Sequence, residues 1–464
     1  MILPSTSLEP LELTPVVREF IADALTPISA YIALATPGRS CLLESVEGTD
    51  RIARYSFIGL DYLEASSFDD DPQMLEKIRA LVGAYRLPEH SKLPFSGGAV
   101  CVFTYDAARV FERIGPKPPA DVVFADALVL VPGTWVVFDH FTHRVTLIGF
   151  ARGEDDLESV ERRLDAYISR LLEVRPTVPG AVQARGPISA SMDQATFLDR
   201  VAQAKHFIYE GDCYQLQVGI RYSCELDGAA FDAYRHVRSR NPSPYMFFIE
   251  HDGRAVFGAS PEFLVRLDNG DAQLRPLAGT RPRGETPQRD SEIAAELLEN
   301  EKERAEHVML VDLGRNDLGR VCKMGSVHVD ELMVIERYSH VMHIVSNVVG
   351  KLRADKDALD LFASSFPAGT VTGTPKIRAM QIIDTLEPVR RGFYAGSVAH
   401  VHFDGNMDSC IILRCVATAH GRAYWQASAG IVADSEPLAE YQEILHKTRI
   451  VREVLGISEA QIPS

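Results

Sequence analysis

The sequence predicts an α+β protein built on large antiparallel sheets. Short apolar runs typical of strands are mixed with helical patterns along the chain, and they do not alternate as regularly as in a protein of repeated βαβ units. The composition agrees with a large folded core, because 46% of the 464 residues are hydrophobic and 24% are charged. A disordered chain has fewer apolar residues for its charge.

The first part of the chain is predicted to be rich in strands. Strand-like runs occupy residues 31–36, 40–46, 97–105 and 129–150. Helical patterns occupy residues 72–86 and 154–172, and the second of these is strongly charged. Residues 175–191 are rich in Pro, Gly and Ser without periodicity, which indicates a linker.

After the linker, Met192 and Asp193 can cap a helix over residues 195–212. Strands are predicted at residues 215–226, 245–259, 262–277, 334–352, 397–418 and 423–433. An acidic helix is predicted from about residue 291 to residue 312, and a last helix at residues 437–456.

Charge and cysteine content exclude several classes of protein. Asp and Glu outnumber Lys and Arg by 64 to 48, a net charge of −16, which argues against a protein that binds a nucleic-acid backbone. No uncharged apolar run approaches the ~18 residues of a membrane span, and the N-terminus lacks a signal-peptide pattern. The seven cysteines contain no CxxC pair. We expect a soluble, cytoplasmic protein without nucleic-acid or membrane partners.

Two helices carry acidic stripes. Glu299, Glu303 and Glu306 are spaced by four and three residues, and Glu440, Glu443 and Lys447 by three and four. Glu306 also enters an apolar helix end, and a buried carboxylate needs a cation or a proton. Such carboxylates suit Mg²⁺, although each stripe alone could be a solvated face or a surface ion pair, and spacing cannot show that the stripes meet.

His343 lies among valines in a predicted strand, where histidine is more often a core residue than a catalytic one. A neutral imidazole held there could also transfer protons. The pattern alone leaves both interpretations open.

Seven segments in order resemble the chorismate-utilising enzymes. They are PLAGTRPRG, EKERAEHVMLVDLGRNDLG, RYSHVMHIVS, FPAGTVTGTPKIRAM, RRGFYAGSVAH, CIILR and QASAGIV, within residues 276–432. Within that family the sequence is most similar to the large subunits (component I) of anthranilate synthases. The resemblance implies a sandwich of sheets with helices packed outside, in two interleaved subdomains. It also implies an N-terminal regulatory region over residues 1–175 and a chorismate-binding catalytic domain over residues 192–455.

The resemblance implies a lyase that converts chorismate and ammonia to anthranilate and pyruvate, the first committed step of tryptophan biosynthesis. In this family Mg²⁺ is held by glutamates that match Glu306 and Glu443, with those matching Glu303 and Glu440 close by. Glu262 matches a general acid for the departing hydroxyl, and His343 matches a histidine associated with pyruvate elimination. Thr280, of the AGT motif, is implied as a further catalytic residue. Substrate-binding positions match Gly279, Thr280, Tyr394, Arg414, Ala429, Gly430 and Lys447.

Two positions distinguish branches of the family. The water-adding synthases carry a lysine base where this chain has Gln215, and aminodeoxychorismate synthases carry a lysine where it has Ala278. Ammonia is already nucleophilic and needs neither lysine, which favours the anthranilate synthase branch. Aminodeoxychorismate synthase component I and a non-catalytic tryptophan sensor are kept as alternatives. Ser428 departs from the family pattern, which usually has glycine there.

The resemblance also implies feedback inhibition by tryptophan. The motifs LLES and NPSPYM match the two halves of the effector site, with Leu43, Glu44, Ser45, Pro244, Tyr245 and Met246 as the expected contacts. Without the resemblance these segments would be a strand end and a Pro-rich turn. No segment resembles the cysteine nucleophile motif of a glutamine amidotransferase. A separate glutaminase subunit is therefore expected, in an assembly with two copies of each chain.

Overall fold

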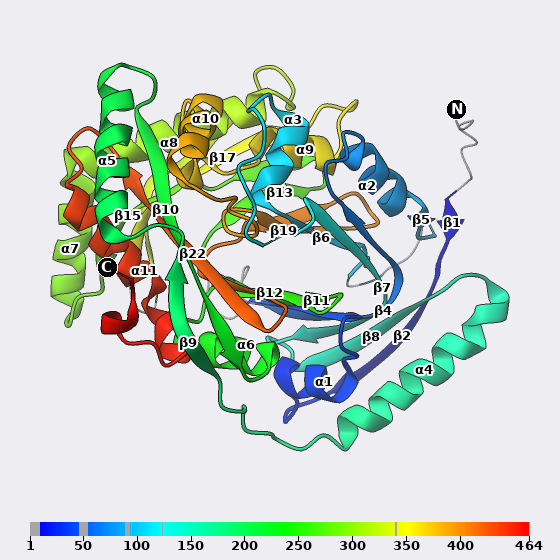
Figure 1. Ribbon diagram of the computed structural model, residues 1–464. Helices are drawn as coiled ribbons and strands as arrows, with labels where there is room; N and C mark the ends of the chain where they lie inside the picture. The colour runs from blue at the N-terminus through cyan, green and yellow to red at the C-terminus, as the bar shows by residue number, and fades with distance from the viewer. Residues whose placement is uncertain are drawn as a thin grey trace.

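The computed structural model describes residues 10–45, 54–88, 93, 95–122, 124–338 and 341–463. Its strands occupy the centre of the molecule and most helices lie around them (Figure 1). The prediction of an α+β fold with large antiparallel sheets in a sandwich is confirmed.

One half of the strand ladder belongs mainly to the region after residue 182. It runs through β9 (Gln183–Ala190), β10 (Gln215–Asp227), β22 (Arg422–Ile431), β21 (Cys415–Ala419), β12 (Arg254–Ser260), β11 (Tyr245–His251) and β3 (Ser40–Glu44). All these neighbours are antiparallel, and the two-residue β18 (Gly373–Thr374) adds to β10. Strand β3 comes from the N-terminal region, so this sheet is built from both parts of the chain.

The other half continues from β3. It runs through β4 (Tyr55–Phe68), β7 (Ala127–Asp139), β6 (Ala99–Phe103), β19 (Ser397–Val401), β20 (Met407–Ile411), β13 (Phe263–Asp268), β14 (Asp271–Leu274) and β17 (Val341–Lys351). Strands β15 (Leu277–Pro282) and β16 (His328–Arg337) flank β17, while β8 (Arg144–Ala151) and β2 (Thr14–Ile21) branch from β7. The antiparallel β6–β19 pair again joins the two regions. A separate parallel pair is formed by β1 (Leu11–Glu12) and β5 (Tyr85–Arg86).

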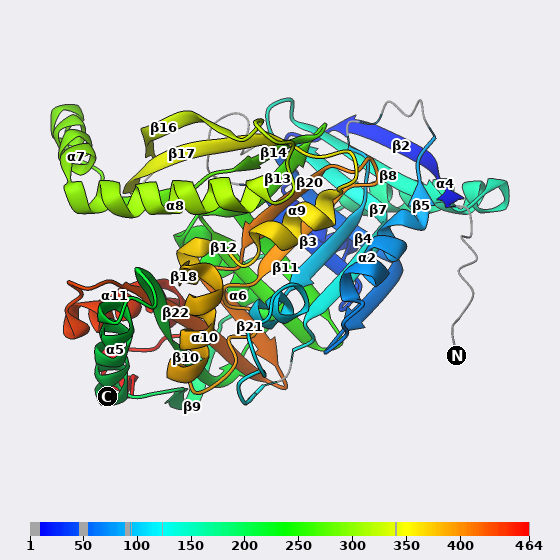
Figure 2. The ribbon, with the colours of Figure 1, turned by 90° about the horizontal axis from the view of Figure 1, so that it is seen from above.

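The helices pack outside the sheets (Figure 2). They are α1 (Pro27–Leu34), α2 (Met74–Gly83), α3 (Ala108–Phe111), α4 (Glu154–Leu172), α5 (Gln194–Tyr209), α6 (Ala230–Arg240), α7 (Pro287–Glu299), α8 (Glu301–Gly319), α9 (Ala358–Ser365), α10 (Lys376–Leu386) and α11 (Pro437–Val454). None of them, over the residues described, has the length and apolarity needed to cross a bilayer.

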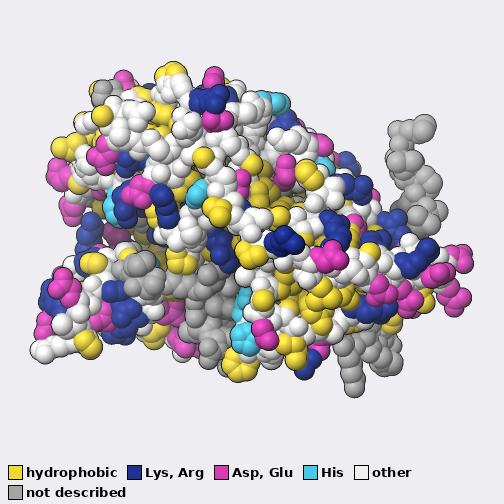
Figure 3. All heavy atoms as spheres, turned by 90° about the horizontal axis from the view of Figure 1, so that it is seen from below, with side chains coloured by type: hydrophobic (Ala, Val, Ile, Leu, Met, Phe, Trp, Pro, Cys, Tyr) yellow, Lys and Arg dark blue, Asp and Glu magenta, His cyan; other side chains and the backbone are white. Residues whose placement is uncertain are grey.

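The core follows this layering. A cluster that includes Cys41, Trp135, Phe247 and Ile412 is contributed by strands of both halves of the ladder. Two larger clusters lie between the sheets and their covering helices, for example around Phe197 of α5. On the surface, acidic and basic side chains are interspersed over the face seen in Figure 3.

Several sequence-based predictions of elements are wrong, most of them in part. Residues 31–36 are not a strand, because Thr26 and Ser29 form a capping box that starts α1 upstream of them. The segment 175–191 is not entirely a linker, since its second half pairs with β10 as β9. The predicted strand 334–352 overlaps two paired strands, β16 and β17. The predicted strands 129–150, 245–259 and 262–277 likewise each overlap two paired strands. The predicted helix 291–312 overlaps two helices, because Asn300 ends α7 and caps α8.

Candidate active site

His343 and Thr280 face each other across two paired strands. Thr280 of β15 is the register partner of His343 in β17, and His343 Nδ1 lies 3.1 Å from both Thr280 Oγ1 and the Gly279 carbonyl oxygen. A proton on Nδ1 satisfies that carbonyl and leaves Nε2 as the acceptor. Burial lowers the pKa of His343, so the imidazole is neutral and can accept a proton.

Gly279 makes this arrangement possible. Its φ of +62° is a left-handed conformation that favours glycine. A Cβ at this position would also lie only 3.1 Å from Glu303 Oε2. The glycine therefore lets β15 pass close to the acidic side chains of α8.

His343, Arg414 and Lys447 line one cavity of about 360 Å³. The Arg414 side chain is exposed on the cavity wall. Partial desolvation by the surrounding protein lowers the pKa of its guanidinium. Among the described residues, its guanidinium has no hydrogen-bond or ion-pair partner. An unpaired guanidinium in a cavity suits a planar carboxylate, which it can bind through two parallel hydrogen bonds.

The structure brings the two acidic stripes together. Burial raises the pKa of Glu306, and the negative charges of Glu303 on the same helix and of Glu440 and Glu443 on α11 raise it further. Burial and Glu443 likewise raise the pKa of Glu440. Carboxylates of α8 and α11 therefore lie within electrostatic reach of one another, which spacing in the sequence could not show.

Nearby cations compensate this negative charge only in part. Glu303 accepts a hydrogen bond from Arg281 at 2.9 Å, and Glu443 pairs with Lys447 at 2.5 Å. Among the residues that the structure describes, Glu306 has only a long ion pair of 3.9 Å with Lys302.

Two expectations for the acidic stripes are wrong in detail. The Glu306 side chain is 29% exposed and the neighbouring Val308 is 44% exposed, so Glu306 is half-buried rather than buried. Glu299 lies on α7 and does not share a helix with Glu303 and Glu306.

The four glutamates fit Mg²⁺ by donor type. Among the described residues, three acidic ligand atoms lie within 4.8 Å of one another only at Asp69, Asp70 and Asp126. The Lys117 ammonium, 2.6 Å from Asp70 and 2.7 Å from Asp126, already compensates that group. The glutamates of α8 and α11 are spaced more widely. Mg²⁺ commonly binds through one or two carboxylates and keeps several waters, so an open set of this kind fits it.

Glu262 lies beside the larger cavity rather than in it. It lines a small cavity of about 30 Å³ with Gly369 and Thr370, whereas its neighbour Pro261 lines the larger one. Glu262 Oε1 accepts a hydrogen bond of 3.1 Å from Thr370 Oγ1. Burial raises the pKa of Glu262 to about 8, so its carboxyl group is largely protonated at neutral pH.

Tyr394 and the QASAGIV segment meet in the protein interior next to Lys447. The Tyr394 hydroxyl lies 2.6 Å from Ser428 Oγ, and burial raises the pKa of Tyr394 to about 12. Lys447 Nζ donates to the Ser428 carbonyl oxygen at 2.8 Å. Ala429 is fully buried, and a Cβ at Gly430 would lie 2.8 Å from Gln215 Nε2.

Sequence reasoning missed Gln217 and Thr370. Ser428 Oγ donates to Gln217 Oε1 at 2.8 Å, and Gln217 Nε2 donates to the Thr370 carbonyl oxygen at 2.9 Å. Gln217 follows Gln215 by two residues in β10, so both point to the same face of the strand. That spacing could have indicated Gln217. Thr370 lies within the FPAGTVTGTPKIRAM segment, but nothing in that segment distinguishes it from its neighbours.

All six residues of the expected effector site line a second cavity of about 360 Å³. Strand β3 supplies Leu43 and Glu44, and the paired strand β11 supplies Tyr245 and Met246. Ser45 and Pro244 adjoin these two strands. The two motifs are thus adjacent, although about two hundred residues separate them in the sequence.

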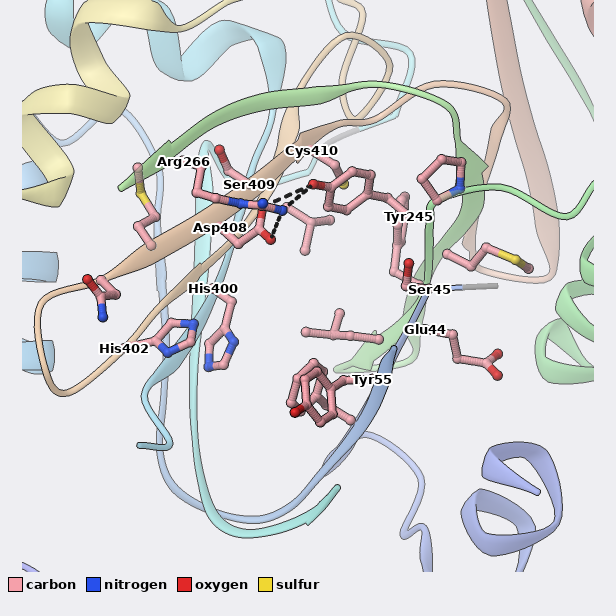
Figure 4. A pocket seen from close by; sticks show the side chains of 18 of the residues that line it. Glu44, Ser45, Tyr55, Tyr245, Arg266, His400, His402, Asp408, Ser409 and Cys410 are labelled. Carbon is pink, nitrogen blue, oxygen red and sulfur yellow. Dashed lines mark hydrogen bonds and ion pairs between the residues drawn. The ribbon is translucent and has the colours of Figure 1, made fainter. Parts of the chain in front are cut away.

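The polar groups of this second cavity differ from those expected. Glu44 points away from Arg266 and Asp408 (Figure 4), and its carboxylate is bound by Arg238 at 2.9 Å. Arg266 instead donates to Asp408 at 2.8 Å and to the Tyr245 hydroxyl at 3.1 Å. Arg266 and Asp408 therefore offer charged groups that the two motifs did not indicate.

Comparison with known proteins identifies the relatives of the chain. A family model described as chorismate binding enzyme matches residues 39–453. The chain is 41% identical to anthranilate synthase component 1 of Acinetobacter calcoaceticus, in an alignment covering 96% of this chain and 95% of that protein. It is 42% identical to anthranilate synthase component 1 of Streptomyces coelicolor, covering 97% of this chain and 90% of that protein.

Solved structures agree with these sequence matches. Anthranilate synthase component I from Streptococcus pneumoniae superposes with a TM-score of 0.79 and 34% identity, covering 93% of this chain and 99% of that chain. The menaquinone-specific isochorismate synthase from Escherichia coli superposes with a TM-score of 0.75 over 97% of this chain and 96% of that chain. At 20% identity, the second likeness concerns the fold alone.

Proposed function

Because the chain belongs to the chorismate-binding enzyme family, we propose that it catalyses the conversion of chorismate and ammonia to anthranilate and pyruvate. The observation that carries this proposal is the convergence of five elements on one site. Strands β15 and β17 contribute Thr280 and His343, the segment before β21 contributes Arg414, and helices α8 and α11 contribute the four glutamates.

The cations of the cavity suit a substrate with two carboxylates. Arg414 is unpaired among the described residues and offers a planar fork for one carboxylate. Lys447 adds a second positive charge 2.8 Å from the Ser428 carbonyl oxygen. Glu303, Glu306, Glu440 and Glu443 would hold Mg²⁺, and Glu443 also pairs with Lys447. When bound, Mg²⁺ supplies positive charge for the other substrate carboxylate.

Two groups are in the protonation states that the chemistry requires. Glu262 holds a proton at neutral pH, and a group of this kind can donate that proton to a departing hydroxyl. His343 is neutral and can accept a proton when pyruvate is eliminated. One residue thus acts as the acid of amine addition and another as the base of elimination.

The nucleophile follows from what the site lacks. This chain has Gln215 where the water-adding synthases carry a lysine general base, and Ala278 where the aminodeoxychorismate synthases carry a lysine nucleophile. Ammonia carries its own lone pair and needs no general base to attack. These two positions favour amine addition over the formation of isochorismate, and they favour anthranilate over the aminodeoxychorismate alternative.

Two further parts of the proposal concern partners. Related proteins are named component 1, and we infer that this chain likewise works with a second component, a glutaminase that delivers ammonia. We also place tryptophan, as a feedback inhibitor, in the cavity lined by residues of β3, β11 and β20. Its size and its mixed apolar and charged lining suit an aromatic amino acid.

The test is product identification with the purified chain. Chorismate, Mg²⁺ and an ammonium salt should give anthranilate, detected by its fluorescence, and an equal amount of pyruvate. Glutamine should replace ammonium only after a glutaminase subunit is added. Isochorismate, salicylate or a 4-amino product would contradict the proposal, and glutamine use by the chain alone would contradict the need for a partner.

A further inference from the structure

Ser428, Gln217 and Tyr394 form a buried chain of hydrogen bonds beside the proposed substrate site. Ser428 of β22 is 2% exposed, Tyr394 is 6% exposed and Gln217 of β10 is 8% exposed. The Ser428 hydroxyl lies 2.6 Å from the Tyr394 hydroxyl and 2.8 Å from Gln217 Oε1. Each group depends on the others, because buried polar atoms have little water to bind.

The direction of each hydrogen bond in this chain can be assigned by counting protons. Gln217 Nε2 donates to the Thr370 carbonyl oxygen at 2.9 Å, which fixes the orientation of the amide. Gln217 Oε1 can only accept, so Ser428 gives its single proton to Gln217. Ser428 Oγ can then only accept from Tyr394.

The phenol proton of Tyr394 therefore points at Ser428. The opposite assignment would leave Gln217 Oε1 facing the lone pairs of Ser428 at 2.8 Å, with no donor. An unsatisfied buried carbonyl of this kind is costly. Arg391 packs over the Tyr394 ring, 5.8 Å from its centroid, and is itself held by Glu387. The ring is thus supported on one face while its proton is held at the hydroxyl.

We propose that Ser428 is a positioning residue that competes with the substrate carboxylate for the Tyr394 proton. This inference rests on the proposed function and on the substrate-binding role that the family resemblance implies for Tyr394, here taken as binding a carboxylate of chorismate. A carboxylate that binds Tyr394 must replace Ser428 Oγ as the acceptor of the hydrogen bond from the Tyr394 hydroxyl. If the Ser428 hydroxyl then rotates to donate to another partner, Gln217 Oε1 loses its donor. The hydroxyl of Ser428 therefore weakens substrate binding by the value of one hydrogen bond.

The test measures KM for chorismate and kcat in Ser428→Ala and Ser428→Gly. Both variants free the Tyr394 proton for the carboxylate, so KM should fall roughly two- to tenfold, the usual net value of a hydrogen bond, while kcat changes less. In a Tyr394→Phe background the same substitutions should leave KM unchanged. Ser40→Ala removes a hydroxyl that is equally buried and makes two hydrogen bonds with Thr36, and it should leave KM at the wild-type value.

Each outcome separates this inference from the proposed function. A wild-type chain that forms anthranilate, with KM unchanged or raised in both Ser428 variants, would overturn the inference alone. A fall in KM that persists in the Tyr394→Phe background would also overturn it, since Ser428 would then act by another route. A wild-type chain without turnover of chorismate would overturn the proposed function and this inference together. Melting temperatures of all variants identify any loss of folding.

Discussion

Single residues in the proposed site owe their protonation to burial. Glu262 and His343 are shifted in opposite directions, since burial disfavours the charged form of each: it raises the pKa of the carboxyl group and lowers that of the imidazole. The result is a protonated acid and a neutral base at the same pH. Thr370 modulates Glu262, because its hydroxyl donates to the carboxylate and so lowers the pKa that burial has raised.

This environment predicts the pH dependence of the enzyme. If protonated Glu262 is the acid, kcat/KM should fall as pH rises through about 8. Thr370→Val removes the hydrogen bond that favours the carboxylate, so the pKa should rise and the alkaline limb should move to higher pH. A pH profile of kcat/KM measures this shift. Thr104→Val, which alters a buried threonine bonded to the Asp126 carbonyl, serves as the control. A limb that moves to lower pH, or that does not move, would contradict the assignment.

His343 gives a prediction about an intermediate. His343→Met removes the proton acceptor but keeps a side chain of similar bulk, so amine addition should continue while pyruvate elimination slows. Mass spectrometry should then detect an amino-dihydro intermediate as anthranilate release falls. Wild-type release of anthranilate by this variant would return His343 to the role of a core residue.

At the scale of elements, helices α8 and α11 define the proposed metal site. Each helix supplies two of the four glutamates, and the negative charges of the two on α11 raise the pKa of Glu306 on α8. Asn300 sets the start of α8 by accepting a hydrogen bond from the Glu303 amide at 3.0 Å. That cap breaks the acidic segment into two helices and places Glu299 outside the site.

The break between α7 and α8 provides a matched control for the metal assignment. Glu306→Gln and Glu443→Gln each remove a charge from the proposed site, so activity should fall at least roughly tenfold at low Mg²⁺ and recover in part at high Mg²⁺. Glu299→Gln removes the same charge one helix earlier and should leave the Mg²⁺ dependence unchanged. Activity titrated with Mg²⁺ gives the answer. An identical response of Glu299→Gln and Glu306→Gln would reject the site.

On the scale of the whole molecule, the two regions of the chain share their sheets. Strand β3 pairs with β11, and β6 pairs with β19, so N-terminal strands are inserted between strands of the C-terminal region. The cavity in Figure 4 lies at one of these junctions. A ligand bound there would contact β3, β11 and β20 together. Strand β20 ends at Ile411, and residues 412–413 connect it to Arg414 of the proposed active site.

This shared architecture predicts how feedback inhibition would be relieved. The Ser45 hydroxyl is buried at the cavity, so Ser45→Phe should fill part of this cavity and raise the tryptophan concentration needed for half inhibition at least roughly tenfold. Ammonia-dependent activity without tryptophan should stay near the wild-type value. Ser67→Phe adds the same ring on an exposed position of β4 and should stay sensitive to tryptophan. Full inhibition of Ser45→Phe would place the effector elsewhere.

Local patterns in the sequence were sufficient for elements that are stable on local grounds. The charged periodicity of residues 154–172 matches α4 residue for residue, and Asp193 caps α5 as predicted. Patterns were insufficient where the capping hydrogen bonds of one or two residues set where a helix begins or ends. Thr26 and Ser29 turn an apolar run into helix α1, and Asn300 divides an acidic helix, because one cap can outweigh several residues of propensity.

The sequence by itself determined the α+β class, the ordered family motifs and therefore the candidate side chains of the site. Only the tertiary structure decided which of them share a cavity. It put Glu306 and Glu443 of distant helices within electrostatic reach, set Glu262 in a separate small cavity, and turned Glu44 toward Arg238. It also gave Ser428 its partners Tyr394 and Gln217. The physical reason is that burial, pKa and hydrogen-bond direction depend on contacts between strands and helices far apart in the chain, and these contacts have no local signature.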